Sequence, residues 1–143
     1  MHFKKIAETP LTFALIFATG DEIAEGLKSF AEEQKLKDAS FKAIGALSRV
    51  KLGWFDWEEK RYKTAVALEE QVELLSMIGD ITLKDGKPQV HAHIVVSKSD
   101  GSAHGGHLLE AVVRPTCELI LTESSVELRK VIDPASGIAL IKI

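Results

Sequence analysis

The sequence is poor in cysteine, with a single one, Cys117, among its 143 residues. One cysteine excludes a disulfide bond within the chain, and an unpaired thiol suits a reducing compartment. We therefore expect a cytoplasmic protein in which Cys117 acts as a small buried hydrophobic residue.

An excess of basic residues is also missing. The formal net charge is −3 and the pI is about 6.0, so the chain has no general positive field that would attract a phosphate backbone. No segment resembles a nucleic-acid-binding tail. Charge thus argues against direct nucleic-acid binding.

Long hydrophobic runs and divisions of the chain are absent too. Residues 1–10 are polar and mixed, and the apolar run 11–19 is too short for a membrane span, so we expect neither a signal peptide nor a membrane anchor. Without a linker, repeat or low-complexity segment, residues 1–143 are expected to form one domain. There is no Ser-His-Asp order, phosphate loop or dinucleotide fingerprint that would name a reaction.

Histidine, in contrast, is concentrated in one stretch. Residues 90–110 hold four of the five histidines of the chain. Side chains alternate along a strand, so His91 and His93 share one face while Ala92 and Ile94 turn to the other. At about 3.3 Å per residue the two histidines stand roughly 6 to 7 Å apart, a separation that one cation could bridge.

A turn at residues 99–101 folds the chain back toward this strand, because Asp and Gly tolerate left-handed backbone. Gly105 and Gly106 permit close backbone approach, which would aim His107 inward. Three imidazoles with a fourth position open are typical of a catalytic zinc site. His104 is a competing third ligand. The alternative to a metal site is that these histidines are merely solvent-exposed on an edge strand and that the two glycines only form a tight turn.

The same stretch resembles a known family signature. HAHIVVSKSDGSAHGGHLLE is similar to the signature of the PPC domain, the plants and prokaryotes conserved domain, in which a His-x-His strand precedes a Gly-Gly-His-Leu segment. Further matches in the order of the family are Gly20-Asp21-Glu22, Ala43-Ile44-Gly45-Ala46 and residues 72–79. The resemblance covers nearly the whole chain.

This resemblance implies a stand-alone prokaryotic PPC protein with a compact α/β fold, assembled as a homotrimer. The histidines of the family fall on His91, His93 and His107, which favours His107 over His104. The implied cofactor is zinc or another divalent transition metal.

The hydrophobic pattern predicts a mixed α+β fold with a largely antiparallel sheet, one main helix and a short C-terminal helix. Thr19 is the expected N-cap, with Glu22 completing a capping box, and the helix should run to about Lys37. Residues 72–83 read as one long strand or as a pair broken at Gly79, and Pro115 should lie at an edge or a bulge. The expected strands are 11–18, 41–47, 48–57, 62–68, 72–83, 90–96, 111–122 and 138–143, and the short helix is 125–132.

Three charged residues are candidates for a role beside the histidines. Glu73 or Glu110 could orient an imidazole or act as a general base, and Arg114 could pair with an anionic ligand. The alternative for each is a surface charge or a salt-bridge partner.

Three classes of function follow. The first is a trimeric metal-binding protein that acts on or binds a small ligand, with a fold similar to that of acetolactate decarboxylase. The second is a DNA-associated regulator, although the AT-hook of plant relatives is missing and their Gly-Arg-Phe is replaced here by Glu70-Gln71-Val72. The third is an assembly module whose histidines hold a trimer together.

Overall fold

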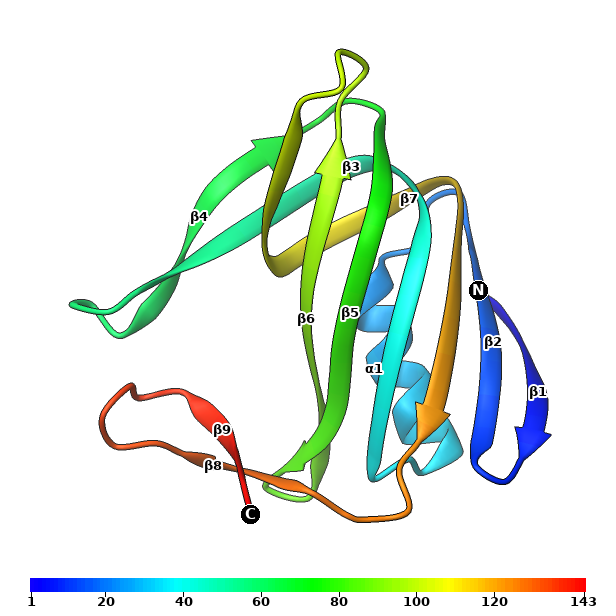
Figure 1. Cartoon of the computed structure of the whole chain (residues 1–143), viewed down its shortest axis with the longest axis vertical. Helices are drawn as coiled ribbons and strands as arrows, with labels where there is room; N and C mark the ends of the chain where they lie inside the picture. Colours follow the sequence, from blue (N-terminus) through cyan, green and yellow to red (C-terminus); the bar gives the residue numbers. More distant parts are fainter.

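A computed structural model describes residues 1–143 as a single compact domain, in which one helix packs on one sheet (Figure 1). The helix is α1 (Ile23–Gln34). The strands are β1 (His2–Glu8), β2 (Leu11–Ala18), β3 (Asp38–Asp56), β4 (Arg61–Leu68), β5 (Val72–Lys84), β6 (Lys87–Ser97), β7 (Ala103–Glu123), β8 (Arg129–Ile132) and β9 (Ala139–Lys142).

The sheet is almost entirely antiparallel, as the sequence predicts. Its main strand order is β1-β2-β7-β3-β5-β8-β9, with β4 on β3 and with β6 between β5 and β7. Because β6 pairs with both of these strands, the sheet curls and brings β7 back beside β6. Only β5 and β8 pair in parallel, through Leu83 and Arg129. β8 and β9 form a hairpin that we call the C-terminal hairpin, at the lower left in Figure 1.

The core lies between α1 and the face of the sheet that the helix covers. The apolar side of α1 buries Ile23, Leu27 and Phe30, and the Phe30 ring meets Phe13 of β2 edge to face at 5.1 Å between centroids. Gly26 allows α1 to pack closely on β2, because a Cβ at this position would lie 2.6 Å from the Phe17 ring. The core residues of β6, Ala92 and others, face the same side, which leaves the histidines on the side away from the helix.

The start of the helix differs from the prediction. Glu22, not Thr19, is the N-cap, and its carboxylate accepts a hydrogen bond from the Glu25 N–H at 2.8 Å. The Thr19 hydroxyl instead donates to the Pro115 carbonyl. The helix ends at Gln34, three residues before the predicted end, because Lys35 adopts a left-handed conformation with φ 56°.

The predicted short helix at 125–132 is wrong. Residues 129–132 form β8 instead, since pairing with β9 satisfies backbone groups that an isolated short helix would have to satisfy alone. A turn with Gly137 at φ +75° joins the two strands. The predicted last strand at 138–143 is confirmed as β9.

The structure also decides where the long strands begin and end. β5 runs unbroken through Gly79, where a Cβ would lie 2.5 Å from the Phe41 ring. The strands expected at 41–47 and 48–57 are one long strand, β3, and Pro115 lies where the β3–β7 register shifts, as expected for a bulge. β1 was not predicted. No helix of the fold has both the length and the apolar character needed to cross a membrane.

Candidate metal centre

Two neighbouring strands bring three histidines together on the face of the sheet away from α1. β6 carries His91 and His93, and β7 carries His107, whose backbone lies opposite His93 in the ladder. Gly106 is essential to this approach, because a Cβ there would lie 2.8 Å from the Gly53 carbonyl oxygen of β3. The strand alternation predicted for residues 90–96 is confirmed.

The three rings converge on one point. Their centroids are 5.2 to 5.6 Å apart, and one ring nitrogen from each lies within 4.8 Å of the other two. Nitrogen ligands bind zinc at about 2.0–2.1 Å, so nitrogens this close to one another could share a single ion. His93 is the most exposed of the three.

His107 is the most constrained of the three rings. It stacks on Tyr62 of β4, with 3.9 Å between centroids and 16° between planes. Burial, and then the charges of His91, His93 and Lys130, lower the pKa of His107 to about 4, so its imidazole is neutral at pH 7. Its Nδ1 is buried and has no hydrogen-bond partner.

His91 lies beside a carboxylate, Asp80, that is not among the candidates predicted from the sequence. Asp80 of β5 lies opposite His91 in the ladder, and its Oδ2 is 3.4 Å from His91 Nδ1. The other oxygen of Asp80 binds Lys130 Nζ at 2.6 Å, and this lysine side chain is only 4% exposed. Burial opposes ionisation of Asp80, but the hydrogen bonds from His91 and Lys130 hold its pKa below the usual value.

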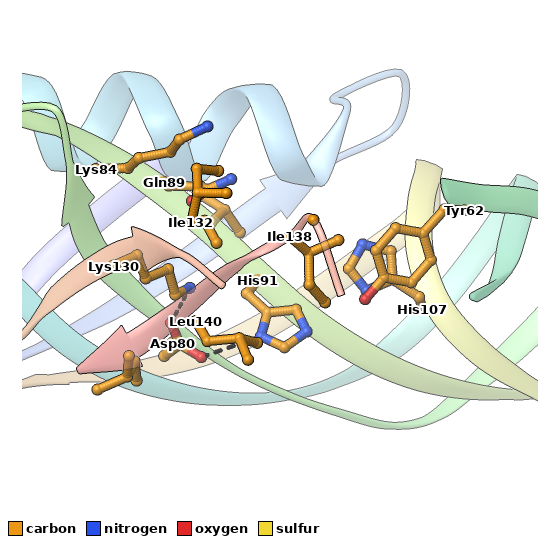
Figure 2. A pocket seen from close by; sticks show the side chains of 14 residues that line it. Tyr62, Asp80, Lys84, Gln89, His91, His107, Lys130, Ile132, Ile138 and Leu140 are labelled. Atoms are coloured by element: carbon orange, nitrogen blue, oxygen red, sulfur yellow. Dashed lines mark hydrogen bonds and ion pairs between the residues drawn. The ribbon is translucent and has the colours of Figure 1, made fainter. Parts of the chain in front are cut away.

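A cavity of about 710 Å³ opens between the C-terminal hairpin and two of the three histidines, His91 and His107 (Figure 2). Figure 2 shows His107 and Tyr62 at one end, Gln89 and Lys84 toward the other, and Ile138 of the hairpin above the His91 ring. The sheet thus supplies the polar floor, and the hairpin supplies an apolar cover that includes Ile132, Ile138 and Leu140.

The residues of this site fit a transition metal ion. Three nitrogen donors converge, His107 is neutral at pH 7, and a buried nitrogen of that ring lacks a partner. The pairing of His91 with Asp80 is the arrangement in which a carboxylate orients a ligating imidazole. The three histidines would supply three ligands to such an ion, which would leave a fourth position for solvent or a small molecule.

The other predicted site residues lie elsewhere. His104 pairs with Val96 in the ladder and is not part of the cluster, and a Cβ at Gly105 would meet only ordinary contacts. Glu110 binds Arg49 and Lys51.

The last two candidates are also remote from the cavity. Arg114 exchanges hydrogen bonds with Gln71, and Glu73 borders a different groove beside Pro115. Neither Arg114 nor Glu73 lines the cavity, which favours the interpretation that both are surface charges without a role at the histidines.

Asp80 could have been found from the sequence. The Asp85-Gly86 turn joins β5 to β6 as a two-residue loop, and counting outward from it places Asp80 opposite His91. Gln89 follows from strand alternation, because it precedes His91 by two residues on the same strand. Tyr62 and Lys130 carry no such local signal, since long-range packing brings them to the cavity.

Fold and site together define a single-domain protein with a curled antiparallel sheet and a three-histidine cluster. A model of the Plants and Prokaryotes Conserved (PCC) domain matches residues 5–125, and the chain belongs to this family, the PPC family named above.

Solved structures support the assignment across almost the full chain. A PPC protein of Pyrococcus horikoshii is 31% identical with a TM-score of 0.86, covering 99% of this chain and 95% of that one. A metal-containing protein of Archaeoglobus fulgidus is 31% identical with a TM-score of 0.85, covering 99% and 97%. A protein of Bacteroides thetaiotaomicron described as a candidate DNA-binding protein is 27% identical with a TM-score of 0.91, covering 99% and 96%.

Two further comparisons are partial. The chain is 31% identical over 129 residues to the bifunctional protein GlmU of a Synechococcus strain, covering 87% of this chain but only 19% of that relative. The chain therefore spans about a fifth of the length of the curated relative that it matches. Acetolactate decarboxylase of Bacillus subtilis, at 13% identity and a TM-score of 0.56, shares the fold alone.

Proposed function

We propose that this PPC protein binds one divalent transition metal ion per chain through His91, His93 and His107. The observation that carries the proposal is the convergence of three imidazole nitrogens within 4.8 Å of one another. The metal-containing relative from Archaeoglobus fulgidus supports it. Imidazole suits zinc, copper, iron and nickel, and zinc is our first candidate because structures with three histidines and an open position are typical of it.

The chain's own residues would prepare the site for a small ligand. Asp80 orients the His91 ring, and Tyr62 holds His107 by stacking. A bound ion would supply Lewis-acid chemistry at the open position. Residues of the C-terminal hairpin line the cavity beside His91 and His107, so a ligand there would contact the hairpin as well as the sheet.

We also propose that the protein is a homotrimer. The face of the sheet away from α1 exposes an apolar patch, the isoleucine patch, formed by Ile16, Ile44, Ile78 and Ile120. Exposed apolar residues gathered in one place are typical of an association surface. Ile78 lies beside His93 in the ladder, so the patch reaches the histidine cluster. The cytoplasmic location expected from Cys117 remains a prediction.

Metal content per chain and mass in solution, measured together on protein without an affinity tag, test both proposals. We expect about one transition ion per chain and a mass three times the 15.7 kDa of the monomer. A trimer that stays free of metal after incubation with zinc would contradict the metal site and favour the third class, an assembly module. A metal-loaded monomer would contradict only the trimer.

The His93→Ala variant tests the ligand set directly. His93 is exposed, so its loss should leave the fold intact while most of the bound metal is lost. His104→Ala is the matched control, because it removes a histidine of the same stretch that lies outside the cluster. Metal content by atomic emission is the readout, with circular dichroism as the check on folding. Undiminished metal in His93→Ala would defeat the assignment.

A second candidate, association with DNA, is favoured by the description of the Bacteroides relative. Fluorescence anisotropy with a labelled duplex between 50 and 200 mM salt is the test, since phosphate contacts make affinity fall steeply with salt. The net charge of −3 leads us to expect no saturable binding. Binding that weakens steeply with salt would instead support the DNA-associated role.

A further inference from the structure

A trimer of the kind proposed above needs two surfaces on each chain. In a closed ring of three identical chains, each chain contacts one neighbour through one surface and the other neighbour through a different surface. The isoleucine patch can supply one of the two. The second surface has to lie elsewhere on the chain, and its assignment rests on the homotrimer proposed above.

The end of the β3–β4 hairpin extends beyond the rest of the sheet. β3 pairs with β7 as far as Gly53, and from Trp54 to Asp56 it pairs with β4 alone. Residues 54–63, which we call the tryptophan arm, thus form a two-stranded ribbon, at the left in Figure 1. A ribbon of only two strands has little stability of its own in water unless something packs on it.

One face of the tryptophan arm packs on its own chain. Phe55 and Tyr62 contact each other edge to face, and Tyr62 stacks on His107. Side chains alternate along a strand, so Trp54 points to the face opposite to Phe55. Trp54 is 60% exposed, so this second face of the arm is left uncovered.

The other exposed aromatic residues contact side chains of their own chain. Phe3 packs edge to face against two phenylalanines of the core. The ammonium group of Lys60 lies 3.6 Å from the centroid of the Trp57 ring. Trp54 makes neither an aromatic contact nor a cation–π contact within the chain.

The isoleucine patch is hollowed in a way that suits a large apolar side chain. A groove of about 580 Å³ runs over the patch, and most of its lining is apolar. Ser76 and Glu118 also line the groove and offer acceptors for an indole N–H, which usually finds a hydrogen-bond partner when it is buried.

Trp54 does not reach the groove of its own chain. Ile44, which lines the groove, precedes Trp54 by ten residues on the same strand. At about 3.3 Å per residue, the two lie about 33 Å apart along β3. Only the groove of another chain is therefore available to Trp54.

We propose that the tryptophan arm of one chain packs on the isoleucine patch of the next chain, with Trp54 in the groove, and that three such contacts close the ring. One surface projects and the other is hollow, as a head-to-tail contact between identical chains requires. Tryptophan is also among the residue types that most often anchor an interface by filling a pocket of the partner.

Two single variants remove one surface each. Ile44→Glu places a charge in the groove, and Trp54→Glu places a charge on the arm, so either variant would bury a charge without a partner at the contact. We expect each variant alone to sediment as a monomer, with circular dichroism as the check on folding. Val126→Glu should remain a trimer, because Val126 lies outside both surfaces.

An equimolar mixture of the two monomeric variants tests the contact itself. The Ile44→Glu chain keeps an intact arm and the Trp54→Glu chain keeps an intact patch, so together they can form one contact. We expect a one-to-one dimer with twice the 15.7 kDa of the monomer, measured by sedimentation velocity at a concentration at which each variant alone is monomeric. The double variant Ile44→Glu/Trp54→Glu is the matched control, because it should form no dimer with either single variant.

The possible failures are distinguishable. An unchanged protein that sediments as a monomer would overturn the homotrimer and, with it, the contact between arm and patch. A trimer that survives Trp54→Glu would overturn the role of the arm alone. A mixture that forms no dimer would also overturn it, since the patches of the three chains would then contact one another around the symmetry axis.

Discussion

The adjacent residues Gly105 and Gly106 differ in how much space surrounds them where β7 packs against β3. A Cβ at Gly106 would lie 2.8 Å from a backbone oxygen of Gly53, which cannot move without shifting β3, whereas a Cβ at Gly105 would meet its neighbours at 3.4 Å. We expect Gly106→Ala to lower the free energy of unfolding by about 1–3 kcal/mol, as overpacking does. Gly105→Ala should change it by less than about 1 kcal/mol.

Urea unfolding of both variants measures this difference. Equal unfolding free energies for the two would show that the β7 backbone can move away from β3, and that Gly106 does not determine the placement of His107.

The Cys117 thiol should not react with alkylating reagents in the folded protein. Its side chain is fully buried in the core, and burial, with the charge of Glu118, raises the pKa of the thiol to about 12. The reactive thiolate is therefore scarce even at pH 9, because this pH lies well below the raised pKa. We expect iodoacetamide to label Cys117 in urea but not in buffer at pH 8 to 9, with mass spectrometry as the readout. Rapid labelling of the native protein would contradict this burial.

Much of the histidine cluster can be predicted from the sequence, because strand alternation and turn formation depend only on neighbouring residues. Strand alternation places His91 and His93 on one face, and the turn at residues 99–101 returns His107 to them. The stacking of Tyr62 on His107 depends on a contact between distant segments, which no local pattern encodes. Glu73, Glu110 and Arg114 were selected for charge alone, and charge does not give position.

At the scale of elements, the C-terminal hairpin is attached to the sheet by few bonds. Its strand β8 pairs with β5 through one residue pair, and Lys130 adds an ion pair to Asp80. Replacing Lys130 with Met removes that charge-assisted bond, which is worth about 1.5–3 kcal/mol. We expect backbone amides of β8 and β9 to exchange hydrogen roughly 10- to 100-fold faster, while those of β3 stay unchanged.

Lys142→Met is the matched control, because Lys142 forms no ion pair. Hydrogen exchange followed by mass spectrometry resolves the hairpin from the rest of the sheet. Unchanged exchange in Lys130→Met would mean that the apolar contacts of the hairpin hold it in place without the ion pair.

Elements with strong periodicity follow from the sequence, whereas β1 and β8 do not. β2, β4, β6 and β9 follow from runs of alternating or apolar residues. β1 is polar and exposed, so its register depends on pairing with β2 rather than on any pattern of its own. The segment 125–132 is compatible with a helix until β9 pairs with it. Pairing partners far along the chain decide such segments.

At the scale of the whole molecule, the isoleucine patch is the feature that a single chain leaves unexplained. Ile44, a member of this patch on β3, is 60% exposed. We expect Ile44→Glu to shift the protein to monomers at micromolar concentration, because a charge would be buried without a partner at the interface. Val126→Glu is the matched control, since Val126 is 61% exposed and lies outside the patch.

Sedimentation velocity of both variants measures the mass in solution. An Ile44→Glu protein with the mass of the unchanged protein would place the interface elsewhere or show that the chain is monomeric.

The histidines and the C-terminal hairpin are separate along the sequence, and this separation affects how homologues of the protein can diverge. The histidines lie within the segment that matches the family, residues 5–125, whereas the hairpin that covers them follows that segment. Substitutions in the hairpin can therefore reshape the cavity without replacing any of the three histidines. One could exchange the hairpin for that of a homologue and change which molecules enter the cavity, while the three histidines of the proposed metal site, carried by β6 and β7, stay the same.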